Sequence, residues 1–452
     1  MTAFFLETAL LPDGWARNVR LDVEGGAITH VSAGGLPDGA ERIGGLVLPG
    51  LPNLHSHTFQ RGMAGLAETR GEATDSFWTW RQVMYRFLDR LTPDDVEAIA
   101  AFAFMEMLES GSTAVAEFHY LHHAADGSAY ADIAELSGRI AAAAAAAGIG
   151  LTLLPVFYAH GGFGGRAPDP GQRRFINDLD GFARLHEAAR RHVAALPGAA
   201  IGIAPHSLRA ATPDELHTLL AVHEKGPVHI HVAEQVREVE DCLAWSGRRP
   251  VEWLLGEIPV DSRWCLVHAT HMTPGETRAM AQSGAVAGLC PLTEANLGDG
   301  IFPGSDFAAA GGRWGVGSDS NVEFGAAAEL KQLEYSQRLS LRQRNVLAAA
   351  PGASTGLSLY RAALAGGAQA LGRAIGAIAP GQRCDLVSLD ASHPSLAGIA
   401  EPHWLDAYVF VAGKAMIDRV VAGGKTLVLG GRHLGRESFA ARYAQTLRKV
   451  LE

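Results

Sequence analysis

The sequence predicts an α/β protein, a (β/α)8 barrel (TIM barrel) with a small β-sandwich domain formed from both termini. Eight short apolar segments alternate with helical stretches along the middle of the 452-residue chain. Both ends of the chain carry short alternating strands instead. Hydrophobic residues make up 48% and charged residues 19%, which is typical of a globular protein and excludes a disordered one.

The two ends predict one shared sheet. Arg20–Ser32 shows short alternating strands broken by Gly25 and Gly26, and Asp385–Leu389 and Tyr408–Val428 show the same pattern. We therefore expect residues 1–47 and 377–430 to form the β-sandwich domain and residues 48–376 to form the barrel. Residues 431–452 are expected to be a C-terminal helix, because Phe439, Tyr443, Leu447 and Leu451 recur at helical spacing.

The barrel strands follow in order along the middle of the chain. They are expected at Leu46–Leu54, Thr113–Phe118, Leu151–Phe157, Ala200–Pro205, Pro227–Val232, Trp264–Val267, Ala285–Leu289 and Arg313–Gly317. The Ala141–Ala147 run, closed by Gly148, is predicted to end a helix before the third strand. An insertion rich in aromatic residues, Arg61–Leu91, separates the first two strands.

Charge and cysteine content restrict the class of partner. The formal net charge is −10 and no Lys/Arg run occurs, so we expect neither nucleic acid nor a membrane as partner. The four cysteines lie far apart, without a CxxC pair, which argues against a disulfide scaffold or a zinc ribbon. Met1–Asp13 lacks the pattern of a signal peptide, so a cytoplasmic enzyme is expected.

Histidines and a carboxylate stand at the predicted strand ends. His55 and His57 close the first strand, where alternation places both imidazoles on one side. The fifth strand ends in His229-Ile230-His231, the sixth in His268 and the eighth in Asp319. These positions face the C-terminal mouth of a barrel, where active sites lie. Imidazoles with a carboxylate suit Zn²⁺; the alternative is a set of core histidines.

Within the fifth strand His231 is the better ligand, because it lies at the very end, whereas His229 is deeper and suits the barrel core. Glu234 follows three residues later and is a candidate general base and then general acid. The alternative for Glu234 is a carboxylate at a helix N-terminus. No Lys occurs in Ala204–Arg209, at the end of the fourth strand, where a bridging carbamylated Lys would stand, so one metal ion is predicted rather than two.

Two further segments have simpler interpretations. His119, His122 and His123 resemble a second metal cluster but lack carboxylates and strand-end spacing, so we expect a loop with solvated histidines. His160–Gly165 is rich in glycine but lacks the Lys-Ser/Thr of a phosphate loop. We expect a mobile active-site loop there.

Several motifs resemble those of the amidohydrolase superfamily, and the resemblance spans nearly the whole chain. The matching stretches are Leu48–His57, Gly317–Asn321, Gly367–Gly372 and Ile375–Leu386. Two positions depart from the pattern: Asn53 stands where Asp is usual, and Cys384 where Ala is usual. Neither is a ligand position.

The resemblance implies that His55, His57, His231 and Asp319 bind one Zn²⁺ per chain, with another divalent ion such as Fe²⁺ as the alternative. It implies that His268 sits beside the attacking water and orients the substrate. Glu234 would shuttle protons, and Asp319 would also accept a proton from the water.

Within the superfamily the chain most resembles the N-formimidoyl-L-glutamate deiminases of histidine degradation. The supporting stretches are His57–Leu66, Phe77–Arg81, Glu117–His123 and Ala204–Arg209. The resemblance implies hydrolysis of N-formimidoyl-L-glutamate to N-formyl-L-glutamate and ammonia.

Such a substrate is anionic and requires cations in the pocket, for which Arg is the bidentate choice. Arg81 and Arg209 are the candidates, with surface salt bridges as their alternative. Gln60, Tyr120 and His206 follow strand ends and are expected to orient the substrate by hydrogen bonds. For Tyr120 the alternative is packing with a satisfied hydroxyl.

Two other functions stay open from the sequence. One is another aminohydrolase, acting on a heterocyclic or guanidine-type compound. The other is a catalytically silent barrel that acts as a binding protein, which the complete set of expected ligands disfavours. We also expect a homodimer.

Overall fold

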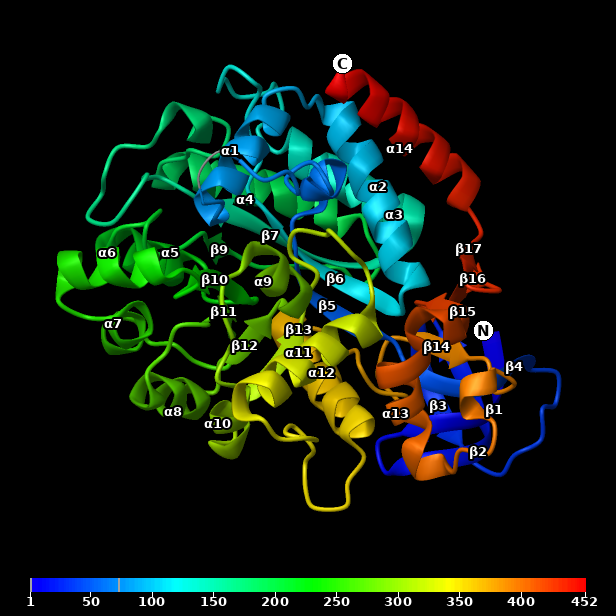
Figure 1. Cartoon of the computed structure of the whole chain (residues 1–452). Helices are drawn as coiled ribbons and strands as arrows, with labels where there is room; N and C mark the ends of the chain where they lie inside the picture. Colours follow the sequence, from blue (N-terminus) through cyan, green and yellow to red (C-terminus); the bar gives the residue numbers. More distant parts are fainter. Residues whose placement is uncertain (1, 72–73) are drawn as a thin grey trace.

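A barrel of parallel strands forms the body of the computed structural model, which describes residues 2–71 and 74–452 (Figure 1). Its strands pair in parallel throughout. They are β5 (Leu51–Ser56), β6 (Ser112–His119), β7 (Gly150–Phe157), β8 (Ala200–Ile201), β9 (Ala204–Pro205), β10 (Val228–Val232), β11 (Trp264–His268), β12 (Val286–Leu289) and β13 (Arg313–Val316). The predicted barrel is confirmed.

Two seams close the barrel. On one side β7 pairs with β8 and β9, and parallel bridges link Ile203 to Val228 and Ser207 to His231. On the other side Ser56 is bridged to Asp319. There the Asp319 amide donates to the carbonyl of His55, and the His57 amide donates to the carbonyl of Asp319, each at 3.0 Å. The second seam therefore lies at the predicted metal-binding residues.

Helices surround the barrel (Figure 1). They include α2 (Pro93–Glu109), α3 (Glu135–Ala147), α4 (Leu179–Ala194), α5 (Pro213–Val222), α6 (Val236–Ser246), α7 (Pro250–Glu257), α8 (Pro274–Ser283), α9 (Pro291–Leu297), α10 (Gly304–Ala309), α11 (Ala326–Leu341) and α12 (Thr355–Leu371). Three of them begin with the same signal, Thr-Pro with an acidic residue at the third helical position. Thr92, Thr212 and Thr273 cap the N-termini of α2, α5 and α8 and form capping boxes. Helix α3 ends, as predicted, at Gly148, whose φ is 82°.

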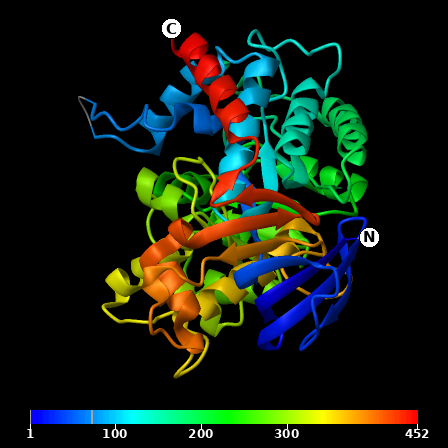
Figure 2. The ribbon, with the colours of Figure 1, turned by 90° about the vertical axis from the view of Figure 1, so that its right-hand side faces the viewer.

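An eight-stranded sheet unites the two ends of the chain beside the barrel (Figure 2). Its order is β17-β16-β15-β14-β4-β1-β2-β3. The N-terminal part consists of β1 (Thr2–Leu11), β2 (Gly14–Glu24), β3 (Ala27–Ser32) and β4 (Glu41–Pro49), and the C-terminal part of β14 (Leu386–Leu389), β15 (Ile417–Ala422), β16 (Lys425–Leu429) and β17 (Arg432–His433). The division of the chain after residues 47, 376 and 430 stays a prediction.

Helix α14 (Arg436–Leu451) follows the sheet and lies along α2 (Figure 1). Tyr443 of α14 stacks on Phe102 of α2 with ring centroids 4.1 Å apart. None of the helices in the described ranges is long and apolar enough to span a membrane.

Two predicted strands are interrupted. The expected Leu46–Leu54 strand breaks at Gly50, so β4 belongs to the terminal sheet and β5 to the barrel. A Cβ atom at Gly50 would lie 2.2 Å from Oγ1 of Thr113, so only glycine fits where the chain changes sheets. The expected Ala200–Pro205 strand divides into β8 and β9, because Ile203 bonds across the barrel seam to Pro227.

The strand prediction for Tyr408–Val428 is wrong in its first part. Residues after α13 (Trp404–Ala407) continue as helical turns, η5 (Tyr408–Ala412) and η6 (Gly413–Met416). Phe410 stacks on Tyr335 of α11, and Cζ of Arg338 lies 4.9 Å from the centroid of the Phe410 ring. These tertiary contacts favour the helical turns over a strand in an apolar run of strand-like composition.

Candidate active site

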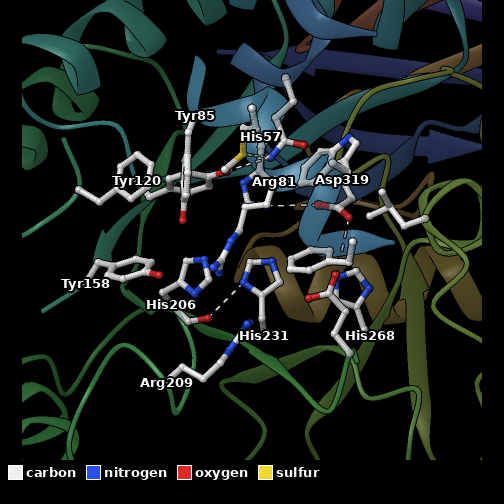
Figure 3. A pocket seen from close by; sticks show the side chains of 17 residues that line it. His57, Arg81, Tyr85, Tyr120, Tyr158, His206, Arg209, His231, His268 and Asp319 are labelled. Carbon is white, nitrogen blue, oxygen red and sulfur yellow. Dashed lines mark hydrogen bonds and ion pairs between the residues drawn. The ribbon is translucent and has the colours of Figure 1, made fainter. Parts of the chain in front are cut away.

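A pocket opens at the C-terminal mouth of the barrel (Figure 3). Its floor is made by side chains at or just after the strand ends, including His57, His231, His268 and Asp319. Helix α1 (Phe77–Leu88), which lies in the predicted aromatic insertion, supplies much of its wall. The pocket therefore combines residues from many strands with one helix outside the barrel.

Four of the predicted residues converge within this floor. The Nε2 atom of His55 lies 3.2 Å from Nε2 of His57 and 3.1 Å from Nε2 of His231. Oδ1 of Asp319 lies 3.3 Å from Nε2 of His55 and 3.2 Å from Nε2 of His57. All four side chains are buried, and their ligand atoms lie within 4.8 Å of one another.

The orientation of the imidazoles fits a divalent cation. Nδ1 of His57 donates to the carbonyl of Phe118 at 2.9 Å, and Nδ1 of His231 donates to the carbonyl of His206 at 3.1 Å. With the proton on Nδ1, each Nε2 presents a bare lone pair to the cluster. Burial also lowers the pKa of His55 to about 3, so this ring is neutral. A tetrahedral zinc site has donor atoms about 3.3 Å apart, close to the separations found here.

Strained backbone positions two of the groups in the site. His268 and Asp319 have φ angles of 65° and 45°, in the left-handed region that residues other than glycine rarely adopt. At Asp319 this geometry allows the backbone to bond both to His55 and to His57 across the seam. The strain turns the carboxylate toward the imidazoles, and the seam hydrogen bonds hold it there.

Glu234 and His268 lie beside the cluster. Nε2 of His268 is 3.8 Å from Oε1 of Glu234 and 3.8 Å from Oδ2 of Asp319. On its other side, Nδ1 of His268 lies 3.2 Å from Oε1 of Glu294. Burial raises the pKa of Glu234 above its ordinary value. The side chain of Glu234 is buried and lines the pocket.

Arg81 and Arg209 enter the pocket from opposite sides, and both guanidinium ends point toward its middle (Figure 3). Arg81 comes from α1, and Arg209 from the segment after β9. The Nε atom of each is buried without a hydrogen-bond partner. Within residues 2–71 and 74–452, neither guanidinium pairs with a carboxylate, which contradicts the surface salt bridge considered for them.

The remaining predicted substrate residues share one wall. Nε2 of Gln60 donates to the hydroxyl of Tyr120 at 2.9 Å, while Oε1 of Gln60 is buried without a partner. His206 also lines the pocket, and burial lowers its pKa well below the ordinary value. Gln60 and His206 are thus neutral polar groups with free hydrogen-bonding capacity.

Sequence reasoning missed several residues of the site. Tyr158, Phe175 and Leu297 line the pocket from loops or helix ends, and Glu294 supports His268 from α9. Trp80 and Tyr85 lie in the aromatic insertion Arg61–Leu91, but their place on the pocket wall was not predicted. The helical periodicity of Phe77–Leu88 was the signal that could have placed them.

The expectation for three other histidines is wrong in one respect. His119, His122 and His123 are buried rather than solvated. His122 and His123 each donate from Nε2 to a backbone carbonyl, those of Val156 and Ile176. His229 lies in the core, as predicted, and bonds to the carbonyl of Ala370 at 2.8 Å.

The residues after the third strand, His160–Gly165, form a loop as predicted. His160 Nε2 lies 3.0 Å from the carboxylate of Glu215, at the start of α5. The mobility expected for this loop stays a prediction.

Two family models match the chain. The model described as Amidohydrolase family matches residues 46–427. The model described as Formimidoylglutamate deiminase HutF, N-terminal domain, matches residues 1–45. Together they cover the barrel and the terminal sheet as far as residue 427, within β16.

Similar proteins support the same grouping. The chain is 54% identical to a formimidoylglutamate deiminase of Pseudomonas aeruginosa, over 100% of both chains. It is 28% identical to an 8-oxoguanine deaminase of the same organism, over 85% of this chain and 83% of that protein.

Solved structures agree. An amidohydrolase from Brucella melitensis superposes with a TM-score of 0.96 at 53% identity, over 100% of both chains. An adenosine deaminase from Xanthomonas campestris with bound zinc shares the fold, with a TM-score of 0.83 at 20% identity, over 100% of this chain and 98% of that one. The chain belongs to the amidohydrolase family and, within it, groups with the formimidoylglutamate deiminases.

Proposed function

We propose that the protein hydrolyses N-formimidoyl-L-glutamate to N-formyl-L-glutamate and ammonia, a step of histidine degradation, with a divalent metal ion in its site. One observation carries the substrate assignment. Two half-buried arginines whose Nε atoms are buried, Arg81 and Arg209, share a pocket with the His/Asp cluster and Glu234. A half-buried guanidinium without a carboxylate within ion-pair distance is stabilised by a bound anion, and this substrate has two carboxylates.

His55, His57, His231 and Asp319 are proposed to hold the ion, which when bound acts as a Lewis acid and supplies hydroxide at neutral pH. Zn²⁺ is proposed rather than Fe²⁺, because three imidazoles and one carboxylate at tetrahedral separations suit zinc.

The proton transfers are assigned to Glu234. Its carboxylate accepts a proton from the attacking water as a C–O bond forms at the amidine carbon, and Asp319 is positioned to assist. Glu234 then returns this proton to the terminal nitrogen of the tetrahedral adduct formed from the protonated amidine. Asp319 accepts the remaining proton of the added hydroxyl as the carbonyl forms, the C–N bond breaks, and ammonia leaves. His268 donates a hydrogen bond from Nε2 to the tetrahedral intermediate.

The two arginines are proposed to bind the substrate carboxylates, and Gln60, Tyr120 and His206 to orient the amidine. Zinc as the resident metal, a homodimer and a cytoplasmic location complete the proposal. Four free, buried cysteines support a reducing compartment.

A second candidate, hydrolysis of a heterocyclic amine, is favoured by the aromatic wall. Phe77, Trp80, Tyr85, Tyr120, Tyr158 and Phe175 line the pocket and would stack on a flat ring. This candidate leaves the two arginines without a role.

Arg209→Met distinguishes the two functions. Ammonia release is measured on formimidoylglutamate and on a panel of heterocyclic amines and guanidines. Loss of a charge-assisted hydrogen bond worth roughly 1.5–3 kcal/mol predicts a tenfold to more than hundredfold lower kcat/KM. The loss should shrink with an analogue that lacks the matching carboxylate. Faster turnover of a heterocycle, with Arg209→Met unchanged, would overturn the deiminase proposal.

A further inference from the structure

Three guanidinium groups gather around one indole. The centroid of the Trp78 ring lies 4.7 Å from Cζ of Arg81, 4.9 Å from Cζ of Arg237 and 5.9 Å from Cζ of Arg209. The three arginines come from three places: α1, α6 and the segment after β9. Trp78 is therefore the common contact of cations that the barrel and the insertion bring together.

Each cation has a further attractive neighbour of its own. The ring of Tyr85 lies 5.5 Å from Cζ of Arg81. Burial alone would lower the pKa of Arg209, but the carboxylates of Glu238 and Glu234 raise it. The Nε atoms of Arg81 and Arg209 are buried and unbonded. Arg237 is mostly exposed, and Asp241 lies 3.8 Å away as its ion-pair partner. Like charges repel, whereas the face of an indole attracts a cation. Among the described residues, the ring of Trp78 is the attractive group that all three share.

Trp78 is not one of the residues that line the pocket, although Phe77, Trp80, Arg81 and Arg209 are. We therefore do not expect the indole to contact a substrate bound in the pocket. An effect of Trp78 on the substrate would pass through the two arginines.

We infer that Trp78 is a positioning residue that fixes the spacing of Arg81 and Arg209 and thereby selects the length of the dicarboxylate. This inference rests on the proposed function. With the spacing fixed, a glutamate derivative engages both guanidinium groups, whereas the aspartate derivative, one methylene shorter, reaches only one of them well. Without the indole, the two cations move apart and this discrimination is lost.

The test compares Trp78→Met, which fills the space without a π face, with Trp78→Phe, which retains one. Trp404→Leu is the control, because Trp404 of α13 packs on Trp15 of the terminal sheet and neither residue is among those that line the pocket. Metal content and Tm report folding, and kcat and KM are measured for formimidoyl-L-glutamate and formimidoyl-L-aspartate.

A cation–π contact is worth roughly a 2- to 30-fold change in affinity, so Trp78→Met should raise KM for the glutamate substrate about tenfold. Its kcat should stay within about threefold, and KM for the aspartate substrate should change much less. Trp78→Phe should recover most of the loss. Isothermal titration with N-formyl-L-glutamate should show the same ranking without turnover.

A double-mutant cycle with Arg81→Met separates positioning from packing. If Trp78 acts through Arg81, Trp78→Met should have little further effect once Arg81 is gone. Additive losses, or equal losses for both substrates, would overturn the inference. If Trp78→Met does not fold, Trp78→Phe still tests the inference. Its weaker cation–π contact should leave a small rise in KM for the glutamate substrate and no comparable rise for the aspartate substrate. A wild-type protein inactive on formimidoylglutamate would instead overturn the proposed function.

Discussion

Burial gives neighbouring side chains of the pocket different protonation states. It lowers the pKa of His231 well below the ordinary value and raises that of Glu234. Burial alone would also lower the pKa of His268, but Glu234, Glu294 and Asp319 surround this ring and raise its pKa to about 10. One buried imidazole is thus suited to bind a cation, and its neighbour to donate a hydrogen bond.

The metal assignment is testable at single residues. His55→Ala or His57→Ala should abolish both metal binding and turnover, because two strand-end donors cannot be replaced by the remainder. His229→Gln is the matched control, since it removes an imidazole two positions before His231 whose partner is a backbone carbonyl. The metal content of each variant, measured by mass spectrometry, tests the assignment. Full occupancy in the His55/His57 double variant, or an empty site in His229→Gln, would refute the assignment.

The proton transfer is tested at Glu234. Glu234→Gln should keep the fold and the metal but lose about 10² or more in kcat, since general acid–base catalysis is typically worth that much. Glu240→Gln, the same change at an exposed position on α6, should leave kcat unaltered. Near-normal turnover by the Glu234 variant, with full metal content, would reduce Glu234 to a structural carboxylate.

At the scale of elements, Asp95 has two roles: it caps α2 and forms an ion pair with Lys449 of α14. The carboxylate of Asp95 caps α2 by accepting from the amide of Thr92 at 3.0 Å, and it lies 2.9 Å from Nζ of Lys449. Burial alone would raise its pKa, but Thr92 and Lys449 outweigh burial and lower the pKa below 3.8.

A depressed pKa means that Asp95 stabilises the folded state above pH 3.8, and that this contribution disappears as pH falls through the folded-state value. Asp95→Asn should therefore lower the free energy of unfolding at pH 7 by about 1 kcal/mol, the usual magnitude for such a capping interaction. The Tm difference from wild type should shrink as pH falls below 3.8. Asp94→Asn, which breaks an exposed ion pair, should change little. A Tm difference independent of pH would contradict this role.

Elements whose pattern is local could be predicted from the sequence. The strands β6, β7 and β10 to β13 lie within about one residue of the expected ends, because each is a short apolar run with polar boundaries. The helical turns at Tyr408–Met416 could not be predicted, since contacts with α11 determine them.

The residues of the candidate site also fall into two groups: those whose place could be predicted from the sequence and those whose place could not. His55, His57 and Asp319 follow from strand alternation and position, so the sequence predicts that they converge. Tyr158 and Glu294 could not be placed, because they reach the site from a loop and a helix whose paths depend on the whole fold.

At the scale of the whole molecule, the proposed metal ligands join parts that are distant in the chain. His55 lies in β5 and His57 directly follows it, His231 lies near the end of β10, and Asp319 follows β13. The strands pair as two groups, β5 to β9 and β10 to β13, that meet only at the seams. A bound ion would therefore hold the two groups together at the seam between His57 and Asp319.

Removal of the metal should then weaken the barrel at this seam. A ligand that binds only the folded state stabilises it by about 4 kcal/mol when its free concentration is a thousandfold above Kd, so chelation should lower Tm and added Zn²⁺ should restore it.

Hydrogen exchange shows which part of the barrel the metal stabilises. The amides of His57 and Asp319, which bond across the seam, should exchange faster in the apo protein, while those between β1 and β2 in the terminal sheet should not change. His57→Ala should show the apo pattern with or without zinc. Uniform acceleration across both regions would mean that the ion stabilises the protein without any special role at the seam, since loss of overall stability alone affects every slowly exchanging amide.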